Sequence, residues 1–386
     1  MIRMSALLPA FAILAACSPG GGTAETGPAA NQAASISPVD GPPFVTTEIA
    51  TFAEPWALAF LPEGKQALVT ERKGVLKLWT VGGGGVDVAG VPAVDYGGQG
   101  GLGDVVLHPR FAENNWVYLS YAEAGEGDTR GAAVARGKLV VAADGSAKLT
   151  GVKTIWRQSA KVDGRGHFGH RIAFAPDGHL FISSGERQKF DPAQDMTVNL
   201  GKVLRLNDDG TVPKDNPFAD NGGVTAQIWS LGHRNPLGLA FDAAGQLWEI
   251  EMGPQGGDEL NRIEPAKNYG YPIVSAGNHY DGRAIPDHDT RPEFAAPAVS
   301  WTPVISPADL IFYSGDLFPD WKGSAFIPGL SSKAIVRVAF KGDTAREAQR
   351  FPMGARIRDV KQGPEGALWV LEDGEKGRLL KLTPRG

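Results

Sequence analysis

Glycine and proline residues frame several side chains of this sequence that are able to do chemistry. His167 lies in the segment GRGHFGHR, between Gly166 and Gly169, where a loop can leave an imidazole reachable as a general base. A histidine that only supports the fold is the alternative. His170 follows three residues later, and because side chains alternate along a strand, the two rings are expected to point to opposite faces.

Two further turns carry groups suited to a charged ligand. The segment GHRNP holds Arg234 beside Asn235, and a guanidinium next to an amide suits a planar, multiply anionic ligand. In Gly253-Pro254 the missing proline N–H and the missing glycine side chain leave carbonyl oxygens free to face a hard cation. A solvated turn and an ordinary loop are the respective alternatives.

Gln99 and a pair of arginines complete this set of candidates. Gln99 lies among glycines just before an expected strand, where a backbone can approach a ligand closely; a glycine-rich turn with a solvated glutamine is the alternative. Arg356 and Arg358 alternate in GARIRDV, so both side chains can reach one anionic ligand or, alternatively, form a salt-bridged strand edge.

Short strands are the elements that must position these residues. The 51 glycines and 28 prolines punctuate the chain at short intervals, which favours an all-β fold with many tight turns. A strand–turn–strand pattern recurs six times, about fifty to seventy residues apart on average, which leaves room for a four-stranded blade. The sequence therefore predicts an all-β six-bladed β-propeller, whose loops at one end of a central channel converge on a site. The six copies are Trp56–Arg72, Gly103–Tyr121, Arg171–Arg187, Leu237–Glu251, Asp359–Asp373 and the degenerate Leu317–Phe340.

The composition limits the possible functions. Hydrophobic residues make up 42% and charged residues 21%, an ordinary globular mixture, and the net charge of −5 offers no basic field for nucleic acid. Cys17 is the only cysteine, which excludes an internal disulfide, thiol catalysis and a cysteine metal site. The sequence has no P-loop or GxSxG elbow in a fitting context and no HExxH helix, which disfavours nucleotide binding and serine hydrolysis.

The first residues have the features of an export signal. Arg3, an apolar run from Ala6 to Ala16 and the sequence LAAC ending at Cys17 resemble a bacterial lipoprotein signal, and the run is too short to span a bilayer. An ordinary cleaved signal is the alternative. We therefore expect a signal segment at 1–17, a flexible linker at 18–43 and one domain at 44–386. The expected location is the periplasm, with a lipid anchor on Cys17.

Five motifs, taken together and in this order, resemble a known family. They are GQGGLGD, GHFGHRIAFAPDG, GHRNPLGLAFD, EMGPQGGDELNRI and RIRDV. The chain from about Phe44 to its end resembles the soluble quinoprotein sugar dehydrogenases, and more closely the aldose branch of the glucose/sorbosone dehydrogenase family. That family is a six-bladed propeller that uses pyrroloquinoline quinone (PQQ) and calcium. The resemblance implies oxidation of an aldose at C1 to the lactone, with electrons passed to an external acceptor.

The resemblance also implies roles for individual residues. His167 would be the general base, and Arg234 with Asn235 would touch the reactive quinone carbonyl. Gly253 and Pro254 would bind calcium through main-chain oxygens. The remaining cofactor contacts would come from Gln99, from the aromatic Trp301 over the ring, and from the cations Lys333, Arg356 and Arg358 at the carboxylates.

Two positions depart from the glucose-oxidising branch. An Asp directly precedes the base there, whereas this chain has Gly166, so the group that orients His167 is open. A tyrosine three residues before the tryptophan is replaced by Ala298, which puts the family's best-known substrate preference in question. Two rival functions are a calcium-dependent propeller lactonase and a non-catalytic binding scaffold. A lactonase site needs several Asp, Glu and Asn side chains on one metal, and the sequence shows no convergent set of that kind.

Overall fold

The computed structural model describes residues 41–342 and 344–386, and in this part of the chain almost all regular structure is β-strand. Three antiparallel sheets have their strands in simple chain order. They are β10 (Gly169–Phe174), β11 (Leu180–Ser184), β12 (Lys202–Leu206) and β13 (Ile228–Leu231); β14 (Pro236–Phe241), β15 (Leu247–Glu251), β16 (Asp258–Arg262) and β17 (Val299–Trp301); and β18 (Ile311–Phe312), β19 (Ala325–Gly329), β20 (Ala334–Lys341) and β21 (Thr344–Pro352). The prediction of an all-β fold is confirmed.

Two antiparallel runs of four strands join into one eight-stranded sheet. The join is a short parallel pairing of β5 with β9, at Val88 with Ala147 and Ala89 with Lys148. The first run is β2 (Pro55–Phe60), β3 (Gln66–Glu71), β4 (Val75–Thr80) and β5 (Gly85–Ala89); the second is β6 (Leu102–Leu107), β7 (Trp116–Ala124), β8 (Arg130–Val141) and β9 (Ala147–Arg157). The helices are single turns: α1 (Phe111–Asn114) and the 3-10 turns Asp191–Ala193, Ala219–Asn221, Thr225–Gln227, His288–Thr290 and Pro319–Trp321.

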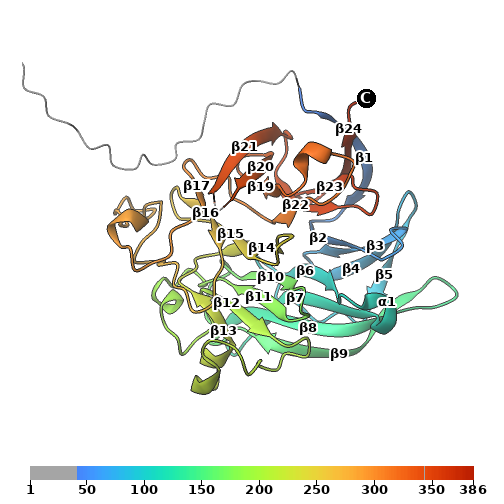
Figure 1. Cartoon of the computed structure of the whole chain (residues 1–386). Coiled ribbons are helices and arrows are strands. Elements are labelled where there is room, and N and C mark those ends of the chain that lie inside the picture. Colours follow the sequence, from blue (N-terminus) through green and yellow to red (C-terminus); the bar gives the residue numbers. More distant parts are fainter. Residues whose placement is uncertain (1–40, 343) are drawn as a thin grey trace, which may run out of the picture. The chain divides into compact units, whose positions relative to one another are not determined.

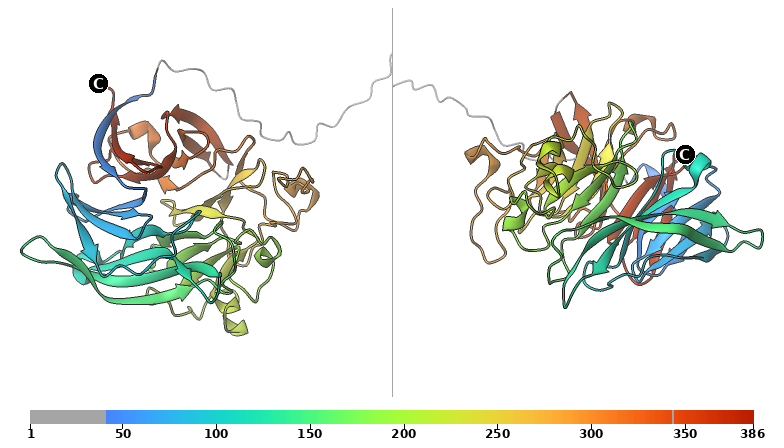
Figure 2. Two further views of the ribbon diagram at one scale, coloured as in Figure 1. Left: turned by 180° about the vertical axis from the view of Figure 1, so that it is seen from behind. Right: turned by 90° about the horizontal axis from the view of Figure 1, so that it is seen from below.

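The last sheet is built from both ends of the chain. Its order is β1 (Phe44–Phe52), β24 (Gly377–Pro384), β23 (Leu368–Glu372) and β22 (Ile357–Gln362), with Phe44 opposite Pro384. Figure 2 shows β1 lying along β24. Each run of four strands touches the next through its first strand, from β2 through β6, β10, β14 and β18 to β22, and β22 touches β2 again. The sheets therefore follow one another in chain order and the series closes on itself (Figure 1).

The repeated sequence pattern produces a repeated turn between the first two strands of a sheet. In the turn after β10, the N–H of Gly178 donates to the carbonyl of Ala175, and Gly178 has φ +90°. Gly245 does the same with Asp242 after β14, at φ +79°. Because residues with a side chain rarely adopt positive φ, glycine is favoured at this step of the turn. The PDG and AAG segments of the sequence thus fix where each strand pair reverses.

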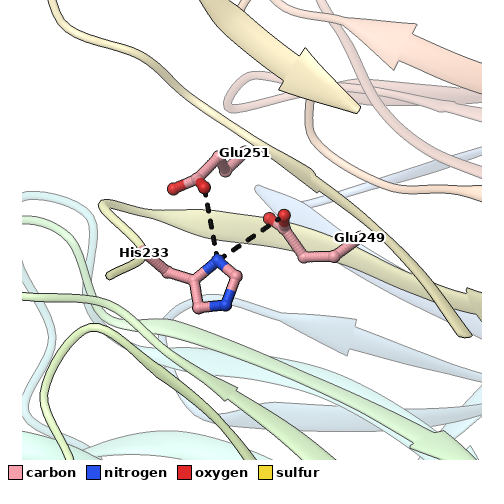
Figure 3. Close-up of side chains that lie close together, drawn as sticks. All are labelled: His233, Glu249 and Glu251. Carbon is pink, nitrogen blue, oxygen red and sulfur yellow. Dashed lines mark hydrogen bonds and ion pairs between the residues drawn. The ribbon is translucent and has the colours of Figure 1, made fainter. Parts of the chain in front are cut away.

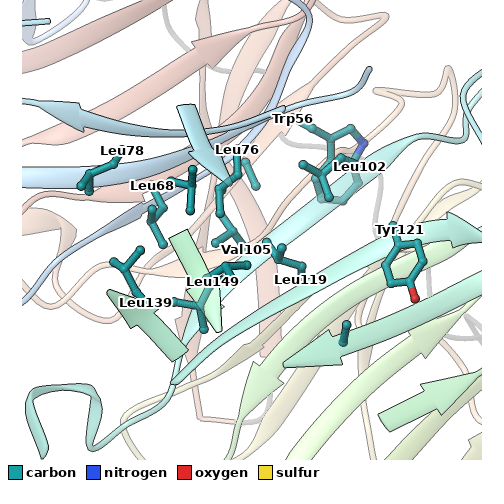
Figure 4. Close-up of a cluster of buried hydrophobic side chains, with 14 of the residues drawn as sticks. Trp56, Leu68, Leu76, Leu78, Leu102, Val105, Leu119, Tyr121, Leu139 and Leu149 are labelled. Atoms are coloured by element: carbon teal, nitrogen blue, oxygen red, sulfur yellow. The ribbon is translucent and has the colours of Figure 1, made fainter. Parts of the chain in front are cut away.

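Apolar clusters fill the space between neighbouring sheets. Figure 4 shows the cluster between β2–β5 and β6–β9, where Leu68, Leu76, Val105 and Leu119 are at most 1% exposed. Burial of one such side chain contributes roughly 1.5–3 kcal/mol before the conformational entropy is counted. The packing therefore holds the sheets face to face and fixes the loops at their ends.

A buried ionic cluster lies where the first strands of the sheets meet. The guanidinium of Arg171, 2% exposed, lies 3.2 Å from Asp104, 3.3 Å from Asp359 and 3.6 Å from Asp309. It also donates from Nε to the carbonyl of Leu237 at 2.8 Å. The carboxylates accept backbone N–H groups of the next sheet, since Asp104 accepts from Ile172 and Asp359 from Leu58. These contacts join β6, β10, β14 and β22 through charged side chains.

The predicted signal segment with Cys17, and the linker up to residue 40, lie outside the described residues. The first strand begins at Phe44. Within residues 41–342 and 344–386, none of the helices has the length and apolar character needed to cross a membrane. The lipid anchor and the domain boundaries remain predictions.

Replacing Arg171 by methionine should lower the free energy of unfolding by about 3–5 kcal/mol, because three buried carboxylates lose their shared cation. Urea unfolding followed by tryptophan fluorescence measures this change. Arg291→Met is the matched control, since Arg291 pairs with Glu293 at the surface and both side chains are roughly half exposed; it should cost less than about 1 kcal/mol. Equal free energies of unfolding of the two variants would contradict the role of Arg171 as the shared cation of the three buried carboxylates.

Candidate active site

Two adjoining cavities collect most of the predicted site residues. The first, of about 330 Å³, is called the cationic cavity here and is lined by Arg72, Gln99, Arg356, Arg358 and Asp373 together with apolar neighbours that include Trp56 and Phe168. The second, of about 250 Å³, is called the histidine cavity and is lined by His167, Glu186, Arg234, Pro254 and an aromatic wall. Phe168 follows His167 directly, so one short backbone segment separates the two.

The backbone that carries His167 is held in an unusual conformation. His167 has φ +50° and His170 has φ +59°, just before and within the start of β10. The N–H of His167 donates to Oε1 of Gln99 at 2.8 Å. His167 lines the histidine cavity and His170 lines the cationic cavity.

Glu186 is the group that orients His167, and the sequence reasoning missed it. Its Oε1 lies 2.5 Å from Nδ1 of His167, and its Oε2 accepts the backbone N–H groups of Lys189 and Phe190, the latter at 2.7 Å. Glu186 is 0% exposed. Glu186 stands two residues after β11, in the segment SSGER. A carboxylate that follows a strand directly, on the side of the sheet where His167 lies, is the signal that could have identified it.

Burial and hydrogen bonding set the protonation of this pair. Burial lowers the pKa of His167 below its usual value, and the hydrogen bond to Glu186 raises it by a smaller amount. Burial would raise the pKa of Glu186, but the hydrogen bonds from His167 and from the N–H of Phe190, together with the charge of Arg234, contribute to lowering it overall. The carboxylate is therefore ionised and accepts the proton of Nδ1, which leaves Nε2 as the basic nitrogen. His167 is a neutral base near pH 7.

Arg234 points its guanidinium at carbonyl oxygens instead of at carboxylates. Its Nη1 donates to Met252 at 2.9 Å and to Gly253 at 2.7 Å, while Nε is buried without a partner among the described residues. The carbonyl of Gly253 thus already faces a cationic group. It is one of the two main-chain oxygens predicted to bind calcium. The residues present fit such an ion through Gly253 and Pro254.

Close backbone packing shapes the Gly253-Pro254 turn. A side-chain carbon added at Gly253 would lie 2.0 Å from the carbonyl oxygen of Gly257, so no larger residue fits. The N–H of Gly253 donates to Asp258 at 2.9 Å. Pro254 lines the histidine cavity, and calcium binding by its carbonyl stays a prediction.

Asn235 does not line either cavity. It is 0% exposed, and its Oδ1 accepts the N–H of Gly169 at 3.2 Å. Its own N–H donates to Glu251 at 3.3 Å. Asn235 therefore ties the Arg234 turn to the segment of His167, and a contact with a cofactor remains a prediction.

Three guanidinium groups face the cationic cavity. Arg356 and Arg358 donate to the same carboxylate, Asp373, at 2.8 Å and 2.7–3.0 Å. Burial would raise the pKa of Asp373, but the two arginines lower it overall. Arg72, which the sequence reasoning missed, donates to the carbonyls of Gly98 and Gly100 beside Gln99. The salt-bridged alternative for Arg356 and Arg358 is therefore observed, and their contact with an anionic ligand in this cavity stays a prediction.

The structure places Trp301 and Lys333 outside the linings of both cavities. Trp301 is 4% exposed, packs in an apolar cluster with Trp248 and Leu260, and donates from Nε1 to Glu347 at 2.7 Å. Lys333 is exposed, at φ +50° in the turn from β19 to β20, three residues after Leu330 of the cationic cavity. Their cofactor contacts stay predictions.

Aromatic side chains form the outer wall of the histidine cavity. The rings of Phe190 and Tyr271 stack with their planes at 28°, and Tyr280, 73% exposed, extends the wall. The guanidinium of Arg234 lies 5.9 Å from the ring centre of Tyr271 and 5.8 Å from that of Tyr280. Apolar ring faces beside polar groups are suited to a small hydroxylated ligand. No motif of the sequence pointed to this wall, because its residues come from two distant loops.

Several known proteins are similar to this chain. The aldose sugar dehydrogenase YliI of Escherichia coli (strain K12) is 42% identical over 339 residues, which are 86% of this chain and 90% of that protein. The quinoprotein glucose dehydrogenase B of Acinetobacter calcoaceticus is 28% identical over 400 residues, with 83% of each chain covered.

Solved structures agree with this similarity. The apo form of the soluble aldose sugar dehydrogenase of Escherichia coli has a TM-score of 0.83 at 40% identity, with 89% of this chain and 100% of that chain covered. The PQQ-bound form of an aldose sugar dehydrogenase from Streptomyces coelicolor has a TM-score of 0.73 at 28% identity, with the same coverage. The family model described as Glucose / Sorbosone dehydrogenase matches residues 52–381, so the chain belongs to the glucose/sorbosone dehydrogenase family.

Proposed function

We propose that this protein oxidises aldose sugars at C1 to the lactone, with PQQ and Ca²⁺ as cofactors, and passes the electrons to a separate acceptor. One observation carries the proposal. His167 is hydrogen-bonded to Glu186 and lines the histidine cavity, which adjoins the cationic cavity with its three guanidinium groups. Relatives named aldose sugar dehydrogenases, one of them solved in a PQQ-bound form, support this reading.

The fold we infer is a six-bladed β-propeller. Four four-stranded sheets and two halves of the eight-stranded sheet give six antiparallel runs, and their first strands follow one another in a closed series. In this arrangement the loops that carry His167, Arg234 and Pro254 and the strand β22 that carries Arg358 come from different parts of the ring, and the two cavities occupy one end of the channel.

The cationic cavity supplies the groups that a tricarboxylate quinone requires. Arg72, Arg356 and Arg358 would pair with its carboxylates, and Gln99 would lie beside it. Lys333, Asn235 and Trp301 are kept as further contacts on the strength of the resemblance. Ca²⁺ would be held by the main-chain oxygens of Gly253 and Pro254, and neutral carbonyls leave most of its charge available. When bound, PQQ supplies the two-electron acceptor and Ca²⁺ supplies Lewis acidity.

The chain's own residues provide the proton chemistry. Nε2 of His167 accepts the proton of the anomeric hydroxyl while C1 gives up its hydride, and the C1–O single bond becomes the lactone carbonyl. Glu186 holds Nδ1–H and stabilises the imidazolium that forms. Arg234, at the boundary of the histidine cavity, is placed to stabilise negative charge that develops on oxygen. The aromatic wall of Phe190, Tyr271 and Tyr280 would hold the sugar and exclude water.

We also propose that the protein is exported and anchored in the periplasm as a lipoprotein through Cys17. The sequence LAAC supports this location.

Replacing His167 by alanine should lower turnover by about 100-fold or more, because a positioned base is lost, and should leave PQQ binding largely intact. Sugar-dependent dye reduction measures turnover, and a spectroscopic titration measures cofactor binding. His179→Ala is the matched control, since His179 lies beside Asp177 in the turn after β10, outside both cavities. Full activity of the His167 variant would remove this residue from the role of base.

Replacing Glu186 by glutamine should lower kcat at least about 10-fold, because the imidazole loses the carboxylate that fixes its tautomer. The rate should fall as pH drops through the lowered pKa of His167, since only the neutral ring accepts a proton. Glu186 raises that pKa, so the acidic limb of the kcat/KM profile should move to lower pH in the variant. Glu186→Asp, which keeps the charge, should restore part of the rate. If the acidic limb of the kcat/KM profile of the Glu186→Gln variant does not move, the pairing of Glu186 with His167 is contradicted.

Removal of metal by a chelator should inactivate the purified protein, and activity should return only when Ca²⁺ and PQQ are both added, because each supplies a different part of the reaction. Dye reduction across a panel of aldoses is the measurement. Undiminished activity in protein shown to be free of metal and quinone would exclude the proposed function.

A further inference from the structure

A second group of ligating side chains lies behind the Arg234 turn, away from both cavities. His233 comes from the turn between β13 and β14, and Glu249 and Glu251 come from β15, where alternate residues share a face (Figure 3). Nδ1 of His233 lies 3.3 Å from Oε1 of Glu251 and 3.8 Å from Oε2 of Glu249. His233 and Glu249 are 0% exposed and Glu251 is 3% exposed. The group is therefore sealed from solvent.

Neutral groups and a third buried carboxylate, Glu259, which lies opposite Glu251, surround these carboxylates. The amide nitrogen of Asn261, on β16 directly opposite Glu249, lies 3.1 Å from Oε2 of Glu249 and 3.3 Å from Oε1 of Glu251. Oε2 of Glu251 accepts the backbone N–H groups of Arg234 and Asn235, at 2.5 Å and 3.3 Å. Burial and the charge of Glu251 raise the pKa of Glu249 well above its usual value. Buried carboxylates this close to one another require a cation or a proton.

Two buried oxygens in this group have no hydrogen-bond partner among the described residues. They are Oε1 of Glu249 and Oδ1 of Asn261, and both residues are 0% exposed. Buried polar atoms are almost always paired, so two orphans in one cluster are informative. The Asn261 amide faces the carboxylates, and a half-turn of this amide, which exchanges nitrogen and oxygen, would point Oδ1 at them. A cation among the carboxylates, or a proton on one of them, would make that orientation favourable.

We propose that His233, Glu249, Glu251 and Asn261 bind a divalent metal ion of the Zn²⁺ or Mn²⁺ type. The ligand atoms of His233, Glu249 and Glu251 all lie within 4.8 Å of one another. An ion with bonds of about 2.1 Å in tetrahedral geometry separates its ligands by roughly 3.4 Å, close to the observed 3.3 and 3.8 Å from the imidazole nitrogen. The site needs little rearrangement to close around an ion.

The surroundings of His233 prepare it as a metal ligand. Its Nε2 lies 2.8 Å from Oγ of Ser230, which can accept the Nε2–H and leave the lone pair of Nδ1 for the ion. The ring stacks on Tyr269, with ring centres 4.8 Å apart. A nitrogen ligand with two carboxylates favours Zn²⁺ or Mn²⁺ over Ca²⁺, which prefers oxygen alone. The ion would thus differ from the Ca²⁺ proposed at Gly253 and Pro254.

The role of this ion is structural positioning. Because the cluster is buried, the ion has no access to a substrate, and a lactonase-type reaction there is excluded by geometry. The expectation from the sequence that no convergent set of acid and amide side chains exists is wrong, since β15 and β16 bring one together. Glu251 accepts hydrogen bonds from the backbone N–H groups of Arg234 and Asn235. An ion bound to Glu251 would therefore fix the turn that contains these two residues.

The test uses full-length purified protein without an affinity tag and without PQQ. The protein is stripped of metal, exposed to Zn²⁺ or Mn²⁺, dialysed, and analysed for metal content and thermal unfolding. The wild type should retain about one ion per chain and show a higher Tm with the ion than without it. Glu249→Gln, which keeps the size of the side chain, should lose the retained ion and the metal-dependent rise in Tm.

Glu71→Gln is the matched control. Glu71 is a buried carboxylate that accepts the N–H of Ala53 at 2.8 Å, and it lies opposite Pro55 just as Glu251 lies opposite Pro236. This variant should keep the ion. Should Glu249→Gln fail to fold, Co²⁺ added to the stripped wild type decides: visible absorption typical of low-coordinate Co²⁺ supports the site. A wild type that retains no ion, or whose Tm does not respond to metal, overturns the proposal and leaves a proton as the partner of the carboxylates.

Discussion

The charge balance around Arg171 is the interaction on which the arrangement of the sheets depends. One guanidinium serves Asp104 of β6, Asp359 of β22 and Asp309 just before β18, and Lys361 adds a second cation 2.7 Å from Asp309. The guanidinium of Arg171 also lies 4.0 Å from the ring centre of Trp56 on β2. Buried charges cost several kcal/mol each unless they are paired, so these sheets are stable only in the arrangement that brings the partners together.

This cluster also divides the interior into two ends. Trp56 and Leu237 line the cationic cavity, whereas Arg171, Asp104, Asp309 and Lys361 line a different cavity of about 440 Å³. On the side of this cluster, the cationic cavity is therefore bounded by apolar and charge-paired groups. Its excess positive charge comes from Arg72, Arg356 and Arg358. A second buried arginine, Arg187, donates to the carbonyls of Gly164 and Gly166 and lies 3.9 Å from the ring centre of Phe168. It holds the strained segment of His167 in place.

The sequence predicted the repeats, and it singled out several residues that line the two cavities, because these depend on local patterns. The strand–turn–strand copies follow from alternating apolar residues and glycine turns, and His167, Arg234, Pro254, Gln99, Arg356 and Arg358 stand in distinctive motifs. Glu186 and Arg72 were missed because each stands in an ordinary SGER or TER segment, and their importance comes from pairing across loops. The aromatic wall was missed for the same reason. For Trp301 the short local match gave no sign that the ring packs in an apolar cluster, and its contact with a cofactor stays a prediction.

The pairing of β1 with β24 has a consequence for how the molecule is made. Phe44 lies opposite Pro384, so the first strand of the domain has no partner until nearly the whole polypeptide has left the ribosome. Contacts of such large sequence separation form slowly. The unclosed intermediate exposes the free edge of β24, where a strand from another molecule can add. Late closure leaves the last strand as the point where misassembly between copies begins.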